Sequence, residues 1–428
     1  MEFFFSTIFY LIILLTLLII IFKNIDYYRF IFLSIFIRLI AILFNLSLFP
    51  LPDSRGDAFN FETKAWFWAL SGPNTVLSEI VTNTHGFSWT YAKIISLIYL
   101  FVGRDYLLIL TFNLLATVFI IHFLIKISKE LNFSNLRCKI LLLLFSLFPA
   151  FINYASVSLR EIYIHLLITM IIYFIIKWIK KFEIKYFFML LFLLYLNNFL
   201  HEGVFVGVLL LIILQISYFI FINKDSILKP VLFILSFMML IPFFYKSIPY
   251  SDMAFKDLPK AFQGMPQCER VAGCEDDKQS LLSALNSKVK ITHVGATSYP
   301  NYLIPNSPIE TLYLSPLRMI YFYIGPHPWD IKKISHLYLL LDSSIYLFLF
   351  LIISLNYKYI LNNKIFLYLI LFFVFYSFIF SFGTSNYGSA YRHRAKFAIF
   401  LFIFVTPIIE NYFLNILPKI RKIYLNKT

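Results

Sequence analysis

The sequence predicts an all-α, polytopic integral membrane protein with about 11 transmembrane helices. Of its 428 residues, 60% are hydrophobic and 14% are charged. A soluble domain carries about 25% charged residues, so the composition excludes a soluble enzyme. Apolar runs long enough to cross about 30 Å of hydrocarbon recur along the chain, and they lack the short alternation of a transmembrane β-barrel.

The spans follow from the positions of these apolar runs. Residues 3–22 count as a span because they lack the basic flank and the small-residue cleavage site of a signal peptide. The apolar stretch 88–103 is short and contains a lysine, so we expect an interfacial helix on the outer face rather than a further span. Residues 1–428 then form one transmembrane domain, with a first outer loop at 51–104 and a large outer loop at 248–335. In order, the predicted spans are 3–22, 30–50, 105–125, 140–156, 161–177, 186–200, 203–222, 230–247, 336–355, 365–382 and 396–416.

The distribution of Lys and Arg sets the predicted orientation. One set of alternating loops, which includes 126–139, 177–185 and the C-terminal tail, holds most of the basic residues of the short loops. Loops of this kind face the cytoplasm, which puts the N-terminus outside and the C-terminus inside. If 88–103 spanned the membrane, the basic loop 126–139 would lie outside, against this bias.

The net charge of +15 does not indicate binding to nucleic acid. The basic residues lie in short clusters at the ends of apolar runs and form no stripe interleaved with aromatic residues. Walker A, GxGxxG, HExxH and GxSxG motifs are also absent from the sequence. ATP-driven transport and serine hydrolysis therefore have no support, and we expect no cofactor.

With this orientation, acids, histidines and arginines gather at helix ends on the outer face. Asp57 lies in the segment PDSRGDAFNFE of the first outer loop, where the alternative role is a helix cap. Arg160 and Glu161 begin a span, and such a pair is costly unless it is paired or functional; the alternative is a snorkelling pair. His201 and Glu202 follow another span, where a histidine is often an ordinary interface residue.

The last outer segment, YRHRAKF, gives the strongest signal. Arg392, Arg394 and Lys396 are three basic residues on an outer loop, against the positive-inside bias, so we expect an anionic ligand to compensate them. Tyr391 and His393 lie in the same run. On a regular helix, residues two apart point in different directions, so both arginines can reach one ligand only if the segment is extended or turned.

Two ionisable residues, Arg38 and Asp342, fall inside predicted spans. Residues of this kind usually face the bundle interior and pair there, and one possibility is that they pair with each other. We assign neither to the site.

The three cysteines divide between the two sides of the membrane. Cys268 and Cys274 lie close together in the large outer loop, where an oxidising environment permits a disulfide between them. A zinc site is the weaker interpretation, because no second Cys or His pair with ligand spacing follows. Cys138 lies on the inner side and is expected to be a free thiol.

The order of these motifs resembles a known group of membrane proteins. It comprises the acidic PDSRGDAFNFE, a span ending in FPAFINYASVSLRE, the aromatic YFYIGPHPWD and the late YRHRAKF. This arrangement is similar to the O-antigen polymerase (Wzy) group, encoded in bacterial surface-polysaccharide clusters. It also resembles the wider GT-C class of membrane glycosyltransferases, which use polyprenyl-linked donors.

The resemblance implies a multi-pass protein of the bacterial inner membrane with an active site facing the periplasm. There a growing glycan on undecaprenyl diphosphate is transferred to the sugar end of a new lipid-linked repeat unit. The implied partners are undecaprenyl-diphosphate-linked glycans and membrane lipid, and a chain-length regulator is left open. In the GT-C class an Asp of the first outer loop is the base, and Asp57 is the matching position. This chain departs from that pattern in having two spans before the loop.

The implied chemistry assigns roles to the outer residues. A leaving diphosphate needs fixed cations, and arginine offers a permanently charged, bidentate fork, so no metal is required. A sugar hydroxyl needs a base to take its proton. The candidate catalytic residues are Asp57, Glu161, Glu202 and His393, and the candidate diphosphate-binding residues are Arg160, His201, Tyr391, Arg392 and Arg394.

Two other functions remain open. One is a GT-C enzyme that moves a single sugar from a polyprenyl-phosphate donor, which these motifs do not separate from a polymerase. The other is a flippase for lipid-linked oligosaccharides. A flippase would place cations along a cavity at membrane depth, whereas the predicted cations lie at the outer ends of spans.

Overall fold

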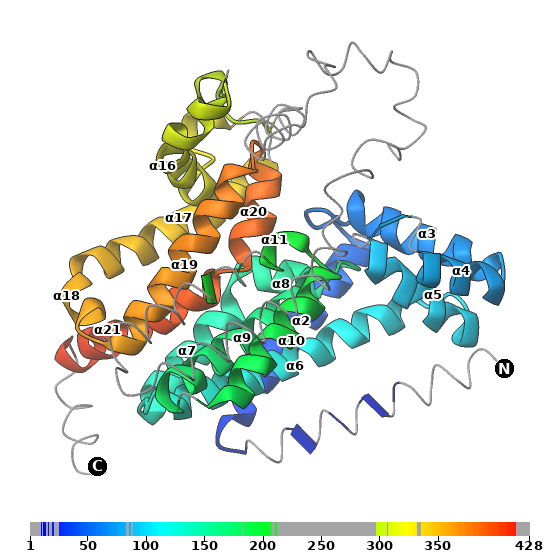
Figure 1. The fold of residues 1–428 in the computed structure, drawn as a ribbon. Coiled ribbons are helices and arrows are strands. Elements are labelled where there is room, and N and C mark those ends of the chain that lie inside the picture. The colour runs from blue at the N-terminus through cyan, green and yellow to red at the C-terminus, as the bar shows by residue number, and fades with distance from the viewer. Residues whose placement is uncertain are drawn as a thin grey trace.

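Figure 1 shows the computed structural model of the protein. It describes residues 25–82, 85–86, 89–181, 183–205, 207, 210–211, 297–305, 307–331 and 335–416, with scattered positions between 10 and 20. Most of the predicted spans 3–22 and 203–222, and all of 230–247, lie outside the described residues. The predicted disulfide between Cys268 and Cys274 also lies outside them.

The regular structure of the described residues is helical, and an isolated β-bridge joins Ser298 to Asn386. This confirms the predicted all-α class. In chain order the elements are η1 (Ile25–Tyr27), α2 (Tyr28–Ser47), α3 (Asp57–Leu70), α4 (Pro73–Thr82), α5 (Thr90–Val102), α6 (Tyr106–Glu130), α7 (Asn135–Leu147), α8 (Pro149–Ala155), α9 (Glu161–Lys181), α10 (Ile184–Asn198), α11 (Glu202–Phe205), η4 (Asn301–Leu303), α16 (Pro308–Ile324), η5 (Pro328–Asp330), α17 (Ser335–Leu355), α18 (Tyr357–Leu361), α19 (Lys364–Phe382), α20 (Tyr387–Ala395) and α21 (Ala398–Ile416).

Several helices of the described part are long and apolar enough to cross a membrane. There are 6 of them, namely α2, α6, α9, α17, α19 and α21. The count rises to 7 if α7 and α8 form one span bent by 59°. The bend follows from Pro149, which lacks an amide hydrogen and holds the preceding residue, Phe148, in an extended conformation. The chain is therefore compatible with a multi-pass membrane protein.

The predicted count of about 11 spans is not reached within the described residues. Helix α10 corresponds to the predicted span 186–200, but its 15 residues extend only about 22 Å at 1.5 Å per residue. That is shorter than the roughly 30 Å of a hydrocarbon core. The other predicted spans without a matching helix are those that lie mostly or wholly outside the described residues.

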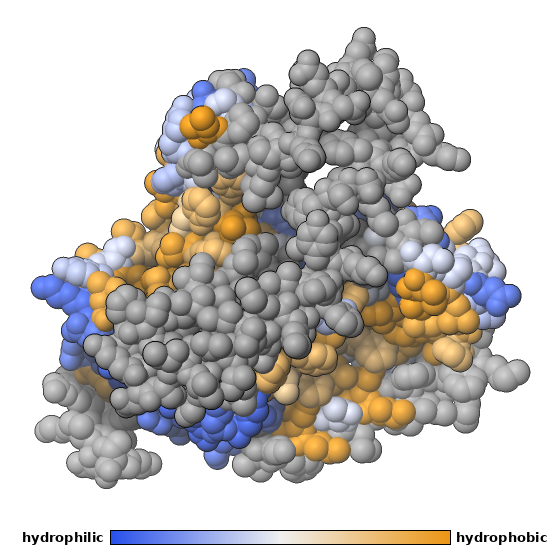
Figure 2. Space-filling view, in the orientation of Figure 1, coloured by the Kyte–Doolittle hydropathy of each residue, from blue (hydrophilic) through white to orange (hydrophobic). Residues whose placement is uncertain are grey.

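The apolar helices differ in how much of their surface is buried. In α6 and α21, 67% of the apolar window is buried, against 22% in α2 and 28% in α17. The exposed residues of α2 and α17 include large apolar side chains such as Phe36, Leu43 and Phe348. Figure 2 shows apolar residues covering much of the visible described surface. We infer that α6 and α21 lie in the interior of the bundle and that α2 and α17 meet lipid.

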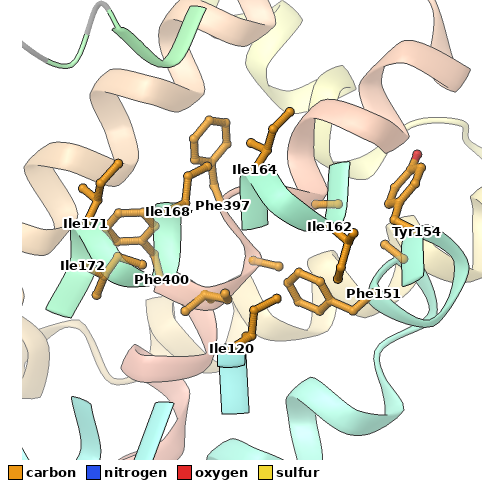
Figure 3. Close-up of a cluster of buried hydrophobic side chains, with 14 of the residues drawn as sticks. Ile120, Phe151, Tyr154, Ile162, Ile164, Ile168, Ile171, Ile172, Phe397 and Phe400 are labelled. Atoms are coloured by element: carbon orange, nitrogen blue, oxygen red, sulfur yellow. The ribbon is translucent and has the colours of Figure 1, made fainter. Parts of the chain in front are cut away.

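Helix α9 is largely buried and packs against α6 and the start of α21 (Figure 3). Its isoleucines recur every three or four residues, as at Ile164 and Ile168, and so line one side of the helix. They face Ile120 of α6 and Phe397 and Phe400 near the start of α21. This packing fixes the position of the first residue of α9, Glu161, at the end of the bundle.

The two ends of α9 carry different polar groups. At its C-terminal end Lys177 pairs with Glu130 of α6 at 3.2 Å. Arg137 near the start of α7 pairs with Glu410 in the C-terminal half of α21. Glu161 lies at the opposite end, and the 21 residues of α9 span about 30 Å. The predicted inner and outer polar residues are thus separated along the helix axis.

The stretch predicted to be interfacial is helix α5, which contacts α3 and α4 to one side of the bundle (Figure 1). Its 13 residues extend about 20 Å, too short to cross the hydrocarbon core. Lys93 is buried in this group, and its ammonium donates to the Gly86 carbonyl at 3.4 Å. Glu62 of α3 accepts bonds from Arg104 and Tyr99, which joins α3 firmly to α5.

The orientation can be tested at two exposed positions at opposite ends of the bundle, Ser71 and Asn362. In a cysteine-free background, Ser71→Cys should react with a membrane-impermeant maleimide in intact cells. Asn362→Cys should react only after the membrane is permeabilised. Labelling with the reverse pattern would place the candidate site on the cytoplasmic side and contradict the predicted topology.

Candidate functional site

The late basic segment forms a regular helix, α20, rather than an extended or turned strand. The Asn386 side chain caps the helix by accepting a bond from the Gly388 amide at 2.8 Å. Arg392 and Arg394 are two residues apart, so they project from opposite sides of the helix. The structure therefore does not bring both arginines to one point, and each has its own surroundings.

Arg392 is the centre of a carboxylate cluster. Its Nη1 lies 2.6 Å from the Asp57 carboxylate, its Nη2 lies 3.2 Å from that of Asp53, and its Nε lies 3.7 Å from that of Glu161. The three acids come from the turn that leads into α3 and from the start of α9, far from Arg392 in sequence. We call Asp53, Asp57, Glu161 and Arg392 the carboxylate cluster.

The turn at 51–57 holds two of these acids in place. Asp53 has a positive φ of 64°, a conformation that Asp tolerates better than most residues. Its carbonyl accepts bonds from the Gly56 and Ala58 amides, at 3.3 Å and 3.2 Å. This places Asp57 at the first position of α3 and turns both carboxylates toward Arg392.

The cluster contains three acids and one arginine. Burial raises the pKa of Asp53 above its usual value, and the nearby Arg392 only partly offsets this. Burial acts to lower the pKa of Arg392, but attraction to Glu161, Asp53 and Asp57 outweighs it, and the pKa lies well above the ordinary value. Arg392 is thus a permanent cation that lies between the three acids and pairs with them.

Glu161 is the most deeply buried of the three acids. Its side chain is 1% exposed, against 27% for Asp53 and 50% for Asp57. Within the described residues neither carboxylate oxygen of Glu161 accepts a hydrogen bond, and the Nε of Arg392 donates none. Buried carboxylates are normally hydrogen-bonded, so this arrangement is unusual.

Arg394 has a different environment from the one predicted. It is fully buried, and its guanidinium binds the Asp342 carboxylate of α17 at 2.8 Å. Asp342 therefore pairs with Arg394 and not with Arg38. The guanidinium also donates to four backbone carbonyls, those of Phe322, Tyr323, Gly325 and Leu339, at 3.3, 2.9, 2.7 and 3.2 Å. The sequence predicts that Arg394 lies on a loop, whereas in the structure it is fully buried and closes the end of α16 against α17.

Tyr391 is also a packing residue in this structure. Its side chain is 1% exposed, and its hydroxyl donates to that of Tyr338 at 3.1 Å. Its ring lies 5.5 Å from that of Tyr154, between α20 and α8. A buried ring of this kind positions the helix that carries Arg392.

The predicted histidines form a second group beside α20. The rings of His201 and His393 lie 5.1 Å apart, edge to face. The ammonium of the buried Lys396 lies 2.9 Å from Nδ1 of His393 and 5.3 Å from the ring of Phe380. These contacts join His393 to His201 and Lys396. Glu202 begins α11, and its side chain is not described.

Arg160 precedes Glu161 at the start of α9. Its guanidinium lies 5.5 Å from the centre of the Phe61 ring, on the side of α3. The side chain is partly exposed. It thus supplies a second cation at the same end of the bundle as the carboxylate cluster.

Two residues near the site carried no assignment in the sequence analysis. Asp53 lies beside Asp57 in a loop where acids are common, so sequence did not distinguish it. His165 lies one turn after Glu161 on α9, is fully buried against Phe151, and has no hydrogen bond to either ring nitrogen within the described residues. An ionisable residue inside an apolar span is the signal that singles it out.

The described residues contain no group of three or more His, Cys, Asp or Glu side chains placed to hold a metal ion. In the carboxylate cluster the guanidinium of Arg392 lies between the acids.

No family model matches the sequence, and no curated protein and no solved structure matches it.

The buried pair predicts a stability phenotype. Arg394→Ala should lower the free energy of unfolding by about 3–5 kcal/mol, because it leaves Asp342 as an uncompensated buried charge. Thermal unfolding of the detergent-purified protein measures this effect. The double variant Arg394→Leu with Asp342→Leu should recover part of the loss, and Arg55→Ala, at an exposed arginine, is the matched control. If the Arg394→Ala protein unfolds at the same temperature as wild type, Arg394 has no structural role and is again a candidate for binding a ligand.

Proposed function

We propose that the protein is a membrane glycosyltransferase that polymerises undecaprenyl-diphosphate-linked oligosaccharide repeat units at the periplasmic face of the bacterial inner membrane. The observation that carries the proposal is the convergence of Asp53, Asp57 and Glu161 on Arg392. These groups lie at the end of the bundle opposite the Lys177–Glu130 pair. A carboxylate cluster at the end of apolar helices suits chemistry on a sugar whose lipid carrier stays in the bilayer.

The acids support the acceptor half of the reaction. A neutral sugar hydroxyl is a poor nucleophile, and a carboxylate within hydrogen-bond reach can take its proton, which typically contributes 10²–10⁴ in rate, an order-of-magnitude figure. Carboxylates also accept hydrogen bonds from sugar hydroxyls and so can orient the acceptor. In the proposal one acid of the cluster is the base and the others hold Arg392 and the sugar.

Arg160 supports the donor half. Departure of undecaprenyl diphosphate develops negative charge, and fixed cations stabilise it by about 3–4 kcal/mol each. Arg160 fills this role in the proposal, because its side chain is partly exposed and lies against Phe61, whereas the three guanidinium nitrogens of Arg392 face the carboxylates of the cluster. Arg394 is assigned to the fold instead, because its donors are used by Asp342 and by backbone carbonyls.

The donor needs no separate activation. A glycosyl diphosphate already carries a good leaving group, so transfer requires no nucleotide hydrolysis. This agrees with the absence of Walker A and GxGxxG motifs from the sequence.

The proposal predicts that Arg392→Lys abolishes polymerisation. Lysine keeps the charge but loses the planar fork, whose three nitrogens face the carboxylates of Asp53, Asp57 and Glu161. In a deletion strain complemented with the variant, lipopolysaccharide gels should show a single repeat unit at normal protein levels. Arg55→Ala, an exposed arginine of the same turn, is the matched control and should restore the full ladder.

The same gels discriminate between enzyme classes. A deletion strain that makes a truncated repeat unit would indicate a single-sugar transferase. A full ladder in the deletion strain, or in the Arg392→Lys strain, would contradict the proposed function.

A further inference from the structure

The three acids of the carboxylate cluster differ in the use of their oxygen atoms. Asp57 accepts a charge-assisted hydrogen bond of 2.6 Å from Arg392. Asp53 accepts a bond from the Tyr154 hydroxyl at 3.5 Å and lies 3.2 Å from Arg392. Neither oxygen of Glu161 accepts a hydrogen bond within the described residues, and its distance to Arg392 Nε is 3.7 Å. The lone pairs of Glu161 are the ones left for a ligand.

A purely structural role does not account for this geometry. A carboxylate that only balanced the charge of Arg392 would be expected at hydrogen-bond distance, as Asp57 is. Glu161 is instead buried, with a side chain 1% exposed, and stands back from the guanidinium. Buried acids without hydrogen bonds are unfavourable and tend to mark functional sites.

The 3.7 Å separation between Oε1 of Glu161 and Nε of Arg392 is one that a hydroxyl group can bridge once the side chains enclosing these buried atoms move apart. Nε of Arg392 carries a hydrogen that it does not donate within the described residues, and it faces Oε1 of Glu161. A hydroxyl oxygen placed about 2.8 Å from both atoms would accept from Nε and donate to Oε1. These are the two hydrogen bonds that a sugar hydroxyl needs before it loses its proton.

We propose that Glu161 is the general base that deprotonates the acceptor hydroxyl, which Arg392 Nε holds in place. This inference rests on the proposed function. In the step, the hydroxyl O–H bond breaks and its proton moves to Glu161, while the oxygen forms a bond to the anomeric carbon of the donor. The bond from that carbon to the diphosphate breaks, and its electron pair leaves with the diphosphate.

The exposure of the cluster indicates the route of the acceptor. Asp57 is half exposed, Arg392 is 16% exposed and Glu161 lies beneath them. In the proposal a sugar first binds at Asp57. It reaches Glu161 when the Arg392 guanidinium releases the Asp57 carboxylate and binds an oxygen of the substrate instead. Asp57 is thus a positioning residue at the entrance, and Glu161 is the catalytic residue.

The test compares Glu161→Gln with Asp57→Asn in nanodiscs, using lipid-linked glycan extracted from a strain that lacks the protein. Glu161→Gln keeps the shape and hydrogen-bonding capacity of the side chain but cannot take a proton. We expect kcat to fall about 10²–10⁴-fold with KM changed less than about threefold, and formate to restore part of the activity of Glu161→Ala. Asp57→Asn should act mainly on KM, and Glu79→Gln, an acid that pairs with His85 outside the cluster, should match wild type.

Each outcome bears on a different statement. A Glu161→Gln protein that keeps kcat within tenfold, or an Asp57→Asn protein that loses kcat instead, would overturn the role of Glu161 and leave the proposed function standing. Loss of binding without a change in kcat would give Glu161 a structural role. A wild-type protein that extends no lipid-linked glycan would overturn both.

Discussion

Buried arginines that donate to backbone carbonyls hold this helical bundle together where its helices end. A helix end leaves carbonyls without intrahelical partners, and in an apolar bundle water is not there to bond them. Arg38 donates to the carbonyls of Phe145 and Ser146 where α7 breaks before Pro149. Arg318 donates to Phe382 and Thr384 where α19 ends, and Arg394 does the same for the end of α16. A cation at a helix C-terminus is also favoured by the helix dipole.

These contacts fix the helix on which the candidate site depends. Arg394 anchors one side of α20 to α16 and α17, so the opposite side, which carries Arg392, faces α3 and α9. The acids that meet Arg392 come from a turn at 53–57 and from the start of α9, and none of these segments forms the site alone. The site is therefore a product of the tertiary packing, and a change in the buried anchors would disperse it without altering any of its residues.

The helical class and most of the described spans could be predicted from sequence, because long apolar runs have few other structures available. The position of Asp57, Glu161 and Arg392 at one shared end of the bundle also followed from the predicted order of spans and loops. The separate roles of Arg392 and Arg394 did not follow, since both lie in the same basic run and differ only in what packs against each side of α20. The partner of Asp342 was likewise hidden, because it lies 52 residues away in sequence.

The sign of the charge in the cluster constrains how a lipid-linked donor could bind. Three carboxylates and one guanidinium repel a diphosphate that approaches Arg392 from the side of Asp57 and Asp53. An acceptor sugar, which is neutral and rich in hydroxyl donors, suits that side. The diphosphate is better matched to Arg160, whose guanidinium lies against Phe61 rather than among the acids. Because Arg160 and Glu161 are consecutive at the start of α9, one helix end holds both the proposed cation for the donor and the proposed base for the acceptor, and in the proposed reaction this would keep the two substrates aligned.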